Sequence, residues 1–316
     1  MEGQVVPEVS VIIPTYNRSS MVQAALASIS RAAFCETEVI VVDDGSTDDT
    51  VPILLQRWTK ELLVNYLTIR IVCCPHTGNV SKLRNEGAKV ARGKLLLFMD
   101  SDVVIDHEFI RQIARFMSMT SRVGAVGGLV YYLSAPCKLY SGGSTFRTGL
   151  SRFLYLMSKA EIRQCPYQVT VVSNAFGILR EAFAATGGFN ELISYMGDES
   201  WIQLRLENIG FQNWVIPSAR AFHDSPIEVG LRQRLQSFNE FKHSAAIKEP
   251  VLVQYHLLRR TAWRLFLGIY LLRVVIVEMV SFMLIKLYRV PDVGRRRLLS
   301  TGRTLRQISR IACGVR

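Results

Sequence analysis

Residues 94–106 have the sequence Lys94-Leu-Leu-Leu-Phe-Met-Asp-Ser-Asp-Val-Val-Ile-Asp106. The apolar run Leu95 to Phe98 predicts a strand buried on both faces, because strands covered by helices on both sides show continuous apolar runs. Two carboxylates, Asp100 and Asp102, follow at the carboxyl end of this strand. Ligands bind beyond this end in open α/β sheets, and hard divalent cations accept carboxylate oxygens. The pattern therefore predicts a cation site, and an ordinary Asp-rich turn is the alternative.

Short strands and helices alternate before this segment. We expect strands over residues 9–13, 38–42 and 68–73 and helices over residues 21–31, 50–59 and 80–90. Such alternation predicts βαβ units, and hence an α/β fold with a mostly parallel sheet flanked by helices. Polar residues also end the first two strands, Thr15-Tyr16 and Asp43-Asp44. Parallel topology would bring three polar strand ends into one crevice.

The second half of the chain continues this pattern with two further polar features. We expect a helix over 106–117 and strands over 124–132 and 211–217. The acidic pair Asp198-Glu199 stands at the start of a predicted helix, where acidic side chains also complement the helix dipole. His223 follows the last predicted strand.

Four motifs in this order resemble those of the family 2 glycosyltransferases, which have the GT-A fold. They are Ser-Val-Ile-Ile-Pro-Thr-Tyr-Asn-Arg (10–18), Val-Val-Asp-Asp-Gly-Ser-Thr-Asp (41–48), Arg-Asn-Glu-Gly (84–87) and Phe-Met-Asp-Ser-Asp (98–102). The resemblance covers about residues 8–245. It implies a metal-dependent enzyme that moves a sugar from a nucleotide-diphospho donor to an acceptor hydroxyl with inversion. The chain lacks Gln-x-x-Arg-Trp, a motif of processive synthases, which favours single addition.

The resemblance implies a set of nucleotide-binding residues. Tyr16 matches the aromatic residue that lies against the base, Asp43 and Asp44 match carboxylates that reach the base and ribose, and Arg84 matches a basic residue near the phosphates. The alternatives are a core tyrosine, a turn with a helix cap, and a solvated helix face. The full set is Pro14, Thr15, Tyr16, Arg18, Asp43, Asp44, Arg84, Asp100 and Ser101.

The resemblance also implies the metal ligands and the general base. Asp100 and Asp102 would hold Mg²⁺ or Mn²⁺ against the donor diphosphate, and His223 would complete the metal shell or be structural. Glu199 occupies the place of the family's base. Because the acidic pair has the reverse of the family's usual order, Asp198 remains the alternative base.

The C-terminal part is apolar and basic. Leu265 to Ile285 forms an apolar stretch of 21 residues, interrupted by Arg273 and Glu278. Residues 255–316 carry 13 Lys/Arg and two Asp/Glu, which accounts for +11 of the chain's net charge of +12. Basic flanks on both sides favour a helix, or a hairpin of helices, lying in the membrane interface at residues 259–297. A true span and a helix packed on the catalytic domain are the alternatives.

These features predict two parts and a location. Residues 1–250 would form the catalytic domain, with the nucleotide-sugar part at about 8–105 and the acceptor part at about 106–250, and residues 251–316 the membrane-associated segment. The six cysteines show no metal-ligand spacing and fit a reducing cytosol, and the absence of an apolar N-terminal leader makes secretion an unexpected outcome. Together with the basic, apolar C-terminal part, these features predict the cytoplasmic face of the cell membrane. We expect a lipid-linked or cell-envelope glycan acceptor. Nucleic acid is not expected, since residues 291–316 lack interleaved aromatics. A catalytically inactive nucleotide-sugar binding or scaffold protein is the alternative.

Overall fold

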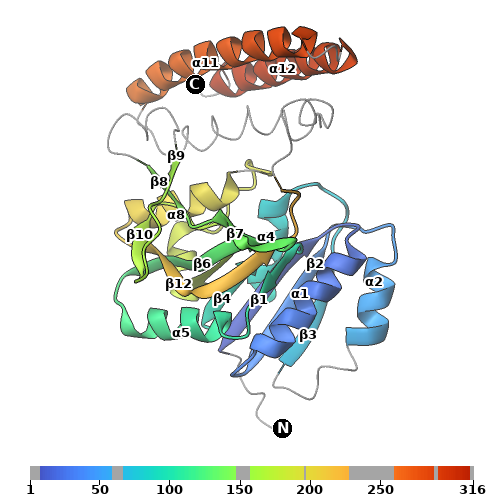
Figure 1. Ribbon diagram of the computed structural model, residues 1–316, viewed down its shortest axis with the longest axis vertical. Helices are drawn as coiled ribbons and strands as arrows, with labels where there is room; N and C mark the ends of the chain where they lie inside the picture. Colours follow the sequence, from blue (N-terminus) through green and yellow to red (C-terminus); the bar gives the residue numbers. More distant parts are fainter. Residues whose placement is uncertain are drawn as a thin grey trace. The chain divides into compact units, whose positions relative to one another are not determined.

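The computed structural model describes residues 8–58, 67–146, 157–195, 197–227, 260–287 and 291–313 of the chain (Figure 1). The chain divides into two compact units. The first consists of Met1–Thr145, Ser158–Glu191 and Asp198–Ile227, and the second contains the two C-terminal helices. The predicted domain boundary near residue 250 lies outside the described residues.

Four parallel strands form the first half of the large sheet. They are β1 (Val9–Thr15), β2 (Thr37–Asp43), β3 (Leu67–Cys73) and β4 (Leu95–Met99), in the order β4-β1-β2-β3. Thr15 of β1 lies opposite Asp43 of β2, so these strands end at the same level. Every residue of β1, β2 and β4 is buried, as their β-branched and apolar sequences predict.

The second half of the sheet is mixed. β11 (Ala175–Leu179) runs antiparallel between β4 and β6 (Val123–Tyr132), while β12 (Gln212–His223) runs parallel to β6. The smaller strands are β5 (Val103–Ile105), β7 (Ala135–Ser141) and β10 (Tyr167–Val169), and β8 (Ser144–Phe146) with β9 (Met157–Lys159) forms a separate sheet. The α/β fold is confirmed, with the parallel arrangement concentrated in the first four strands. The antiparallel β11 brings the loop before it to the carboxyl end of β4.

Helices cover both faces of this sheet. Val11 and Ile13 of β1 belong to the core beneath α1 (Ser19–Ala32) and α5 (Phe109–Met119), whereas Ile12 belongs to the core beneath α4 (Val80–Val90) and α8 (Asp198–Asn208). This division follows from the alternation of side chains along a strand. The remaining helices are α2 (Thr50–Ile53), continued by a π-helical turn at Leu54–Trp58, and α7 (Arg180–Thr186).

The second unit contains α11 (Arg260–Leu287) and α12 (Pro291–Cys313), which pack against each other. Glu278, predicted to interrupt an apolar stretch, accepts two hydrogen bonds from Arg297 of α12 at 2.8 and 2.9 Å. An exposed apolar stripe follows the helical repeat along α11: Leu272, Ile276, Met279 and Met283. No helix in the described part of the chain has both the length and the apolarity to cross a bilayer.

Candidate active site

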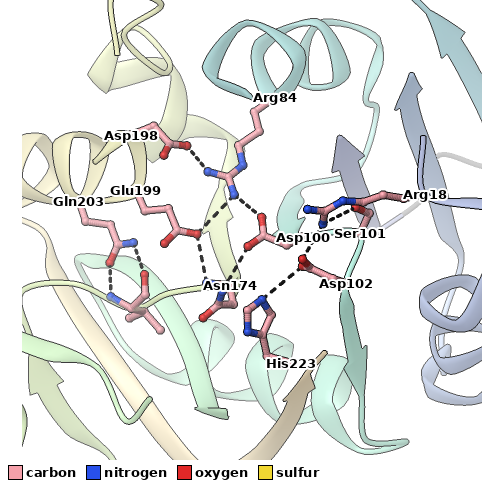
Figure 2. Close-up of polar contacts among 11 residues, drawn as sticks. Arg18, Arg84, Asp100, Ser101, Asp102, Asn174, Asp198, Glu199, Gln203 and His223 are labelled. Carbon is pink, nitrogen blue, oxygen red and sulfur yellow. Dashed lines mark hydrogen bonds and ion pairs between the residues drawn. The ribbon is translucent and has the colours of Figure 1, made fainter. Parts of the chain in front are cut away.

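Carboxylates from β4 and α8 converge on Arg84 of α4 (Figure 2). The Arg84 guanidinium donates to Asp198, to Asp100 at 2.7 Å and to Glu199 at 3.3 Å. Arg84 is only 2% exposed, so the alternative of a solvated helix face is wrong. The buried Arg84 guanidinium therefore links the first carboxylate of the Asp-x-Asp motif, Asp100, to both members of the acidic pair. The contact of Arg84 with a donor phosphate stays a prediction.

The second carboxylate of the motif lies beside Arg18 and His223 (Figure 2). Arg18 donates to Asp102 at 2.5 Å and to Ser101 at 3.4 Å, and Nε2 of His223 lies 3.4 Å from Oδ1 of Asp102. Burial opposes ionisation of Asp102, yet the nearby His223 and Arg18 hold the pKa of its carboxyl below the ordinary value. The centroid of the His223 ring also lies 4.6 Å from that of the Tyr140 ring.

The predicted metal ligands have donor chemistry suited to a divalent cation. Within the described residues, no three His, Cys, Asp or Glu side chains form a ready-made metal centre. Asp100, Asp102 and His223 nevertheless supply two carboxylates and an imidazole, a set that Mg²⁺ or Mn²⁺ accepts. In the described structure, Nδ1 of His223 is buried without a hydrogen-bond partner. These residues fit a cation, provided that Arg18 and Arg84 share their carboxylates with it.

The two members of the acidic pair have different surroundings. Asp198 is buried against Arg84, whereas the Glu199 side chain is 18% exposed and also accepts the backbone N–H of Asn174 at 3.1 Å. Burial raises the pKa of Glu199 to about 8; Asp100 and Asp198 add to the rise, and Arg84 opposes it. Burial likewise raises the pKa of Asp100. Glu199 is therefore the carboxylate suited to accept a proton near neutral pH.

Asp43 and Asp44, predicted to contact the nucleotide, are engaged in their own loops. Asp43 accepts the backbone N–H of Ser46 at 2.9 Å. Asp44 accepts the backbone N–H groups of Thr77 at 2.9 Å and Gly78 at 2.8 Å. Both carboxylates thus order the turns after β2 and β3. This arrangement agrees with the turn alternative, while their contact with a base and ribose stays a prediction.

The remaining predicted nucleotide residues lie on β1 and just beyond it. Tyr16 is 39% exposed and stacks on His76 with ring centroids 4.2 Å apart, so the alternative of a core tyrosine is wrong. Pro14 and Thr15 end β1, and the carbonyl of Thr15 accepts the N–H of Asp44 at 2.9 Å. Tyr16 and His76 together present an aromatic surface beside Asp44.

Sequence reasoning missed Asn174 and Gln203. Asn174 donates its side-chain N–H to Asp100 at 3.2 Å, and its carbonyl accepts the N–H of Asp100 at 3.0 Å. Gln203 accepts the N–H of Val172 and donates to its carbonyl, both at 2.6 Å. No local pattern marks an amide side chain whose partners lie on other elements. For Asn174, the tolerance of asparagine for the left-handed backbone region was a sign that this position could lie in a tight turn.

The sequence matches the family model described as Glycosyl transferase family 2 over residues 10–186. It is 36% identical over 110 residues to poly(ribitol-phosphate) beta-N-acetylglucosaminyltransferase TarS of Staphylococcus aureus, an alignment covering 34% of this chain and 18% of TarS. It is 25% identical over 227 residues to the O-antigen biosynthesis protein RfbC of Myxococcus xanthus, covering 69% of this chain and 17% of RfbC. The chain thus spans less than a fifth of the length of these two relatives.

A solved structure has the same fold. The mannosyltransferase PcManGT of Pyrobaculum calidifontis, in complex with GDP-Man and Mn²⁺, has a TM-score of 0.55 and 17% identity. The alignment covers 95% of this chain and 88% of PcManGT. This likeness agrees with the GT-A fold.

Proposed function

Because the chain belongs to glycosyl transferase family 2, we propose that it transfers a sugar from a nucleotide-diphospho donor to an acceptor hydroxyl with inversion at the anomeric carbon. One observation carries this proposal: Arg84 holds Asp100 of the Asp-x-Asp motif and the Asp198-Glu199 pair around a single buried guanidinium. A donor-side and an acceptor-side carboxylate thereby meet in one site, as a single displacement requires.

On the donor side, Asp100, Asp102 and His223 would hold a divalent cation, and Mn²⁺ with a nucleotide sugar in PcManGT supports this assignment. When bound, such a cation neutralises charge on the diphosphate leaving group. Arg18, which bonds Asp102 and Ser101, is placed to add a guanidinium beside the phosphates. Tyr16 and His76 would lie against the base.

On the acceptor side, Glu199 is the base. It accepts the proton of the acceptor hydroxyl as the oxygen bonds to the anomeric carbon and the bond to the diphosphate oxygen breaks. Asp198 serves as the permanent counter-ion of Arg84, since it is buried and ion-paired. The Asp198 side chain is also only 7% exposed, against 18% for Glu199, so an acceptor hydroxyl reaches Glu199 more readily. The reversed order of the acidic pair is thus compatible with catalysis.

The acceptor is proposed to be a lipid-linked or cell-envelope glycan at the cytoplasmic face of the membrane. TarS and RfbC, by their names, act on a poly(ribitol-phosphate) and in O-antigen biosynthesis, which supports a glycan polymer acceptor. The exposed stripe of α11 and the basic C-terminal sequence support attachment to anionic lipid. Residues 259 and 288–290 of the predicted membrane surface lie outside the described residues.

Vesicle co-sedimentation tests the membrane part. The protein should bind phospholipid vesicles that contain anionic lipid and lose binding in the variant Met279→Glu/Met283→Glu. Met119→Glu is the matched control, because Met119 is an exposed methionine on α5, at 74% exposure. Equal sedimentation of all three proteins, or no binding to any vesicle, would refute attachment through α11.

A nucleotide titration tests the enzymatic part. The purified protein would be titrated with UDP, dTDP and GDP, with and without Mn²⁺, beside Asp102→Ala and the control Glu86→Ala, which removes a carboxylate from an ion pair on the surface of α4. Metal-dependent binding of one nucleotide, lost only in Asp102→Ala, would support the site and name the donor class. Binding without turnover on any acceptor would favour the inactive binding protein. Absence of nucleotide binding would refute the proposal.

A further inference from the structure

We propose that Asn174 is a positioning residue that fixes the donor-side carboxylate Asp100 relative to the acceptor-side carboxylate Glu199. This inference rests on the proposed function, because it assigns roles to both carboxylates. Asn174 lies immediately before β11, beside the end of β4, and dashed lines in Figure 2 join it to both side chains.

Three hydrogen bonds of Asn174 define this arrangement. Its side-chain N–H donates to Oδ2 of Asp100 at 3.2 Å, and its carbonyl accepts the N–H of Asp100 at 3.0 Å. Its backbone N–H donates to Oε1 of Glu199 at 3.1 Å. Asn174 therefore contacts both the backbone and the side chain of Asp100, and it also contacts the side chain of Glu199. The amide orientation follows from chemistry, since a flipped amide would place its carbonyl oxygen against the Asp100 carboxylate.

The backbone of Asn174 explains why this position suits asparagine. Its φ of 69° lies in the left-handed region, which glycine, asparagine and aspartate tolerate better than other residues. Glycine would lack the side-chain donor for Asp100. Aspartate would present an acceptor to a carboxylate. Asparagine alone among these three residues combines the backbone tolerance with a neutral N–H donor.

A second contact holds the loop that carries Asn174 against α8. Gln203 lies one helical turn after Glu199 and binds both backbone groups of Val172 at 2.6 Å. The loop is thus attached to α8 at Val172 through Gln203 and at Asn174 through Glu199. With two attachments, the distance between the loop and the base is defined by the fold before any substrate binds.

The test compares Asn174→Gly and Asn174→Asp with the control Arg122→Gly. Asn174→Gly retains the left-handed backbone and both backbone hydrogen bonds and removes only the side-chain amide. Arg122 is another residue with positive φ, 52°, at the start of β6 and outside the site. The readouts are thermal stability, affinity by calorimetry in Mn²⁺ for whichever of UDP, dTDP and GDP the wild type binds, and kcat and acceptor KM.

We expect Asn174→Gly to be as stable as Arg122→Gly. Its nucleotide affinity should weaken about threefold to tenfold, and its kcat should fall at least about tenfold with acceptor KM unchanged, as for loss of one hydrogen bond to a charged group. Asn174→Asp should bind nucleotide more weakly than Asn174→Gly, because it adds a carboxylate beside Asp100.

The order of the two variants separates positioning from space filling. If Asn174 only fills space, Asn174→Asp will bind and turn over better than Asn174→Gly, because aspartate is closer in size, and the proposal is overturned. Wild-type affinity and kcat in Asn174→Gly would overturn it equally, with the proposed function intact. A wild-type protein that binds no nucleotide would refute the proposed function and this inference together.

Discussion

Replacing Arg84 by methionine should destabilise the sheet-bearing unit severely. Methionine retains most of the apolar stem and removes the cation, which leaves Asp100, Asp198 and Glu199 around a site without positive charge. Removing one partner of a buried ion pair costs about 3–5 kcal/mol, because the remaining charge stays desolvated. The Asp198 side chain is only 7% exposed, so solvent screening gives this carboxylate little relief. A typical domain has about 5–15 kcal/mol of stability, so this loss is a large fraction of the total.

Urea unfolding followed by circular dichroism would measure this effect. Arg84→Lys keeps a charge but not the planar fork that reaches several carboxylates, so we expect an intermediate loss of about 1–3 kcal/mol. The double variant Arg84→Met/Asp198→Asn should be more stable than Arg84→Met alone, because one unpaired carboxylate is neutralised. The coupling energy between the two positions should be about 0.5–3 kcal/mol. Lys89→Met, which removes a cation from an exposed pair on the same helix, is the control and should unfold like wild type.

Two results would refute this reasoning. The first is a loss below about 1 kcal/mol in Arg84→Met, which would show that water or rearrangement compensates the carboxylates. The second is simple additivity of the two substitutions in the double variant. Either result would mean that Arg84 does not hold the carboxylates together in solution, and the proposed link between donor and acceptor sides would lose its basis.

Three further perturbations follow from the structure. The transfer rate should rise with pH and reach half of its plateau value near pH 8, because Glu199 is a base only when ionised and its pKa is about 8. Glu199→Gln should lower kcat by about 100-fold or more, and a pH-independent wild-type rate would contradict this role. Gln203→Glu should lower the free energy of unfolding by about 1–3 kcal/mol, because the buried carbonyl of Val172 loses its donor, and a thermal melt equal to wild type would contradict it. Gly87→Ala should destabilise the protein by about 1–3 kcal/mol despite the better helix propensity of alanine, because the added Cβ would lie 2.4 Å from a side-chain carbon of β1. Gly302→Ala on α12 is the control: its Cβ meets open space, so this substitution should stabilise. Denaturant midpoints that shift in the same direction for both variants would be inconsistent with this packing.

Local sequence patterns were sufficient to predict the α/β class and to place the polar strand ends along one edge of the sheet. Continuous apolar runs predicted β1, β2 and β4, and the helix predicted over 80–90 has the bounds of α4. These features are local, because periodicity and turn residues act over a few neighbouring positions. The polar residues after the strands could be placed in one crevice because parallel strands must end on the same edge.

Which side chains meet at this edge of the sheet, by contrast, depends on tertiary packing. Arg84 and Asp198 are 114 residues apart in the sequence, and no local rule distinguishes a helix-face arginine in water from one surrounded by carboxylates. The antiparallel insertion of β11 brought Asn174 beside Asp100, a contact that depends on strand order rather than strand propensity. The different surroundings of Asp198 and Glu199 depend in the same way on how α8 packs against β6 and β12 of the sheet. The pairing of distant strands sets the distances between these side chains, and burial sets the surroundings of their charges. Both arise only when the chain is packed.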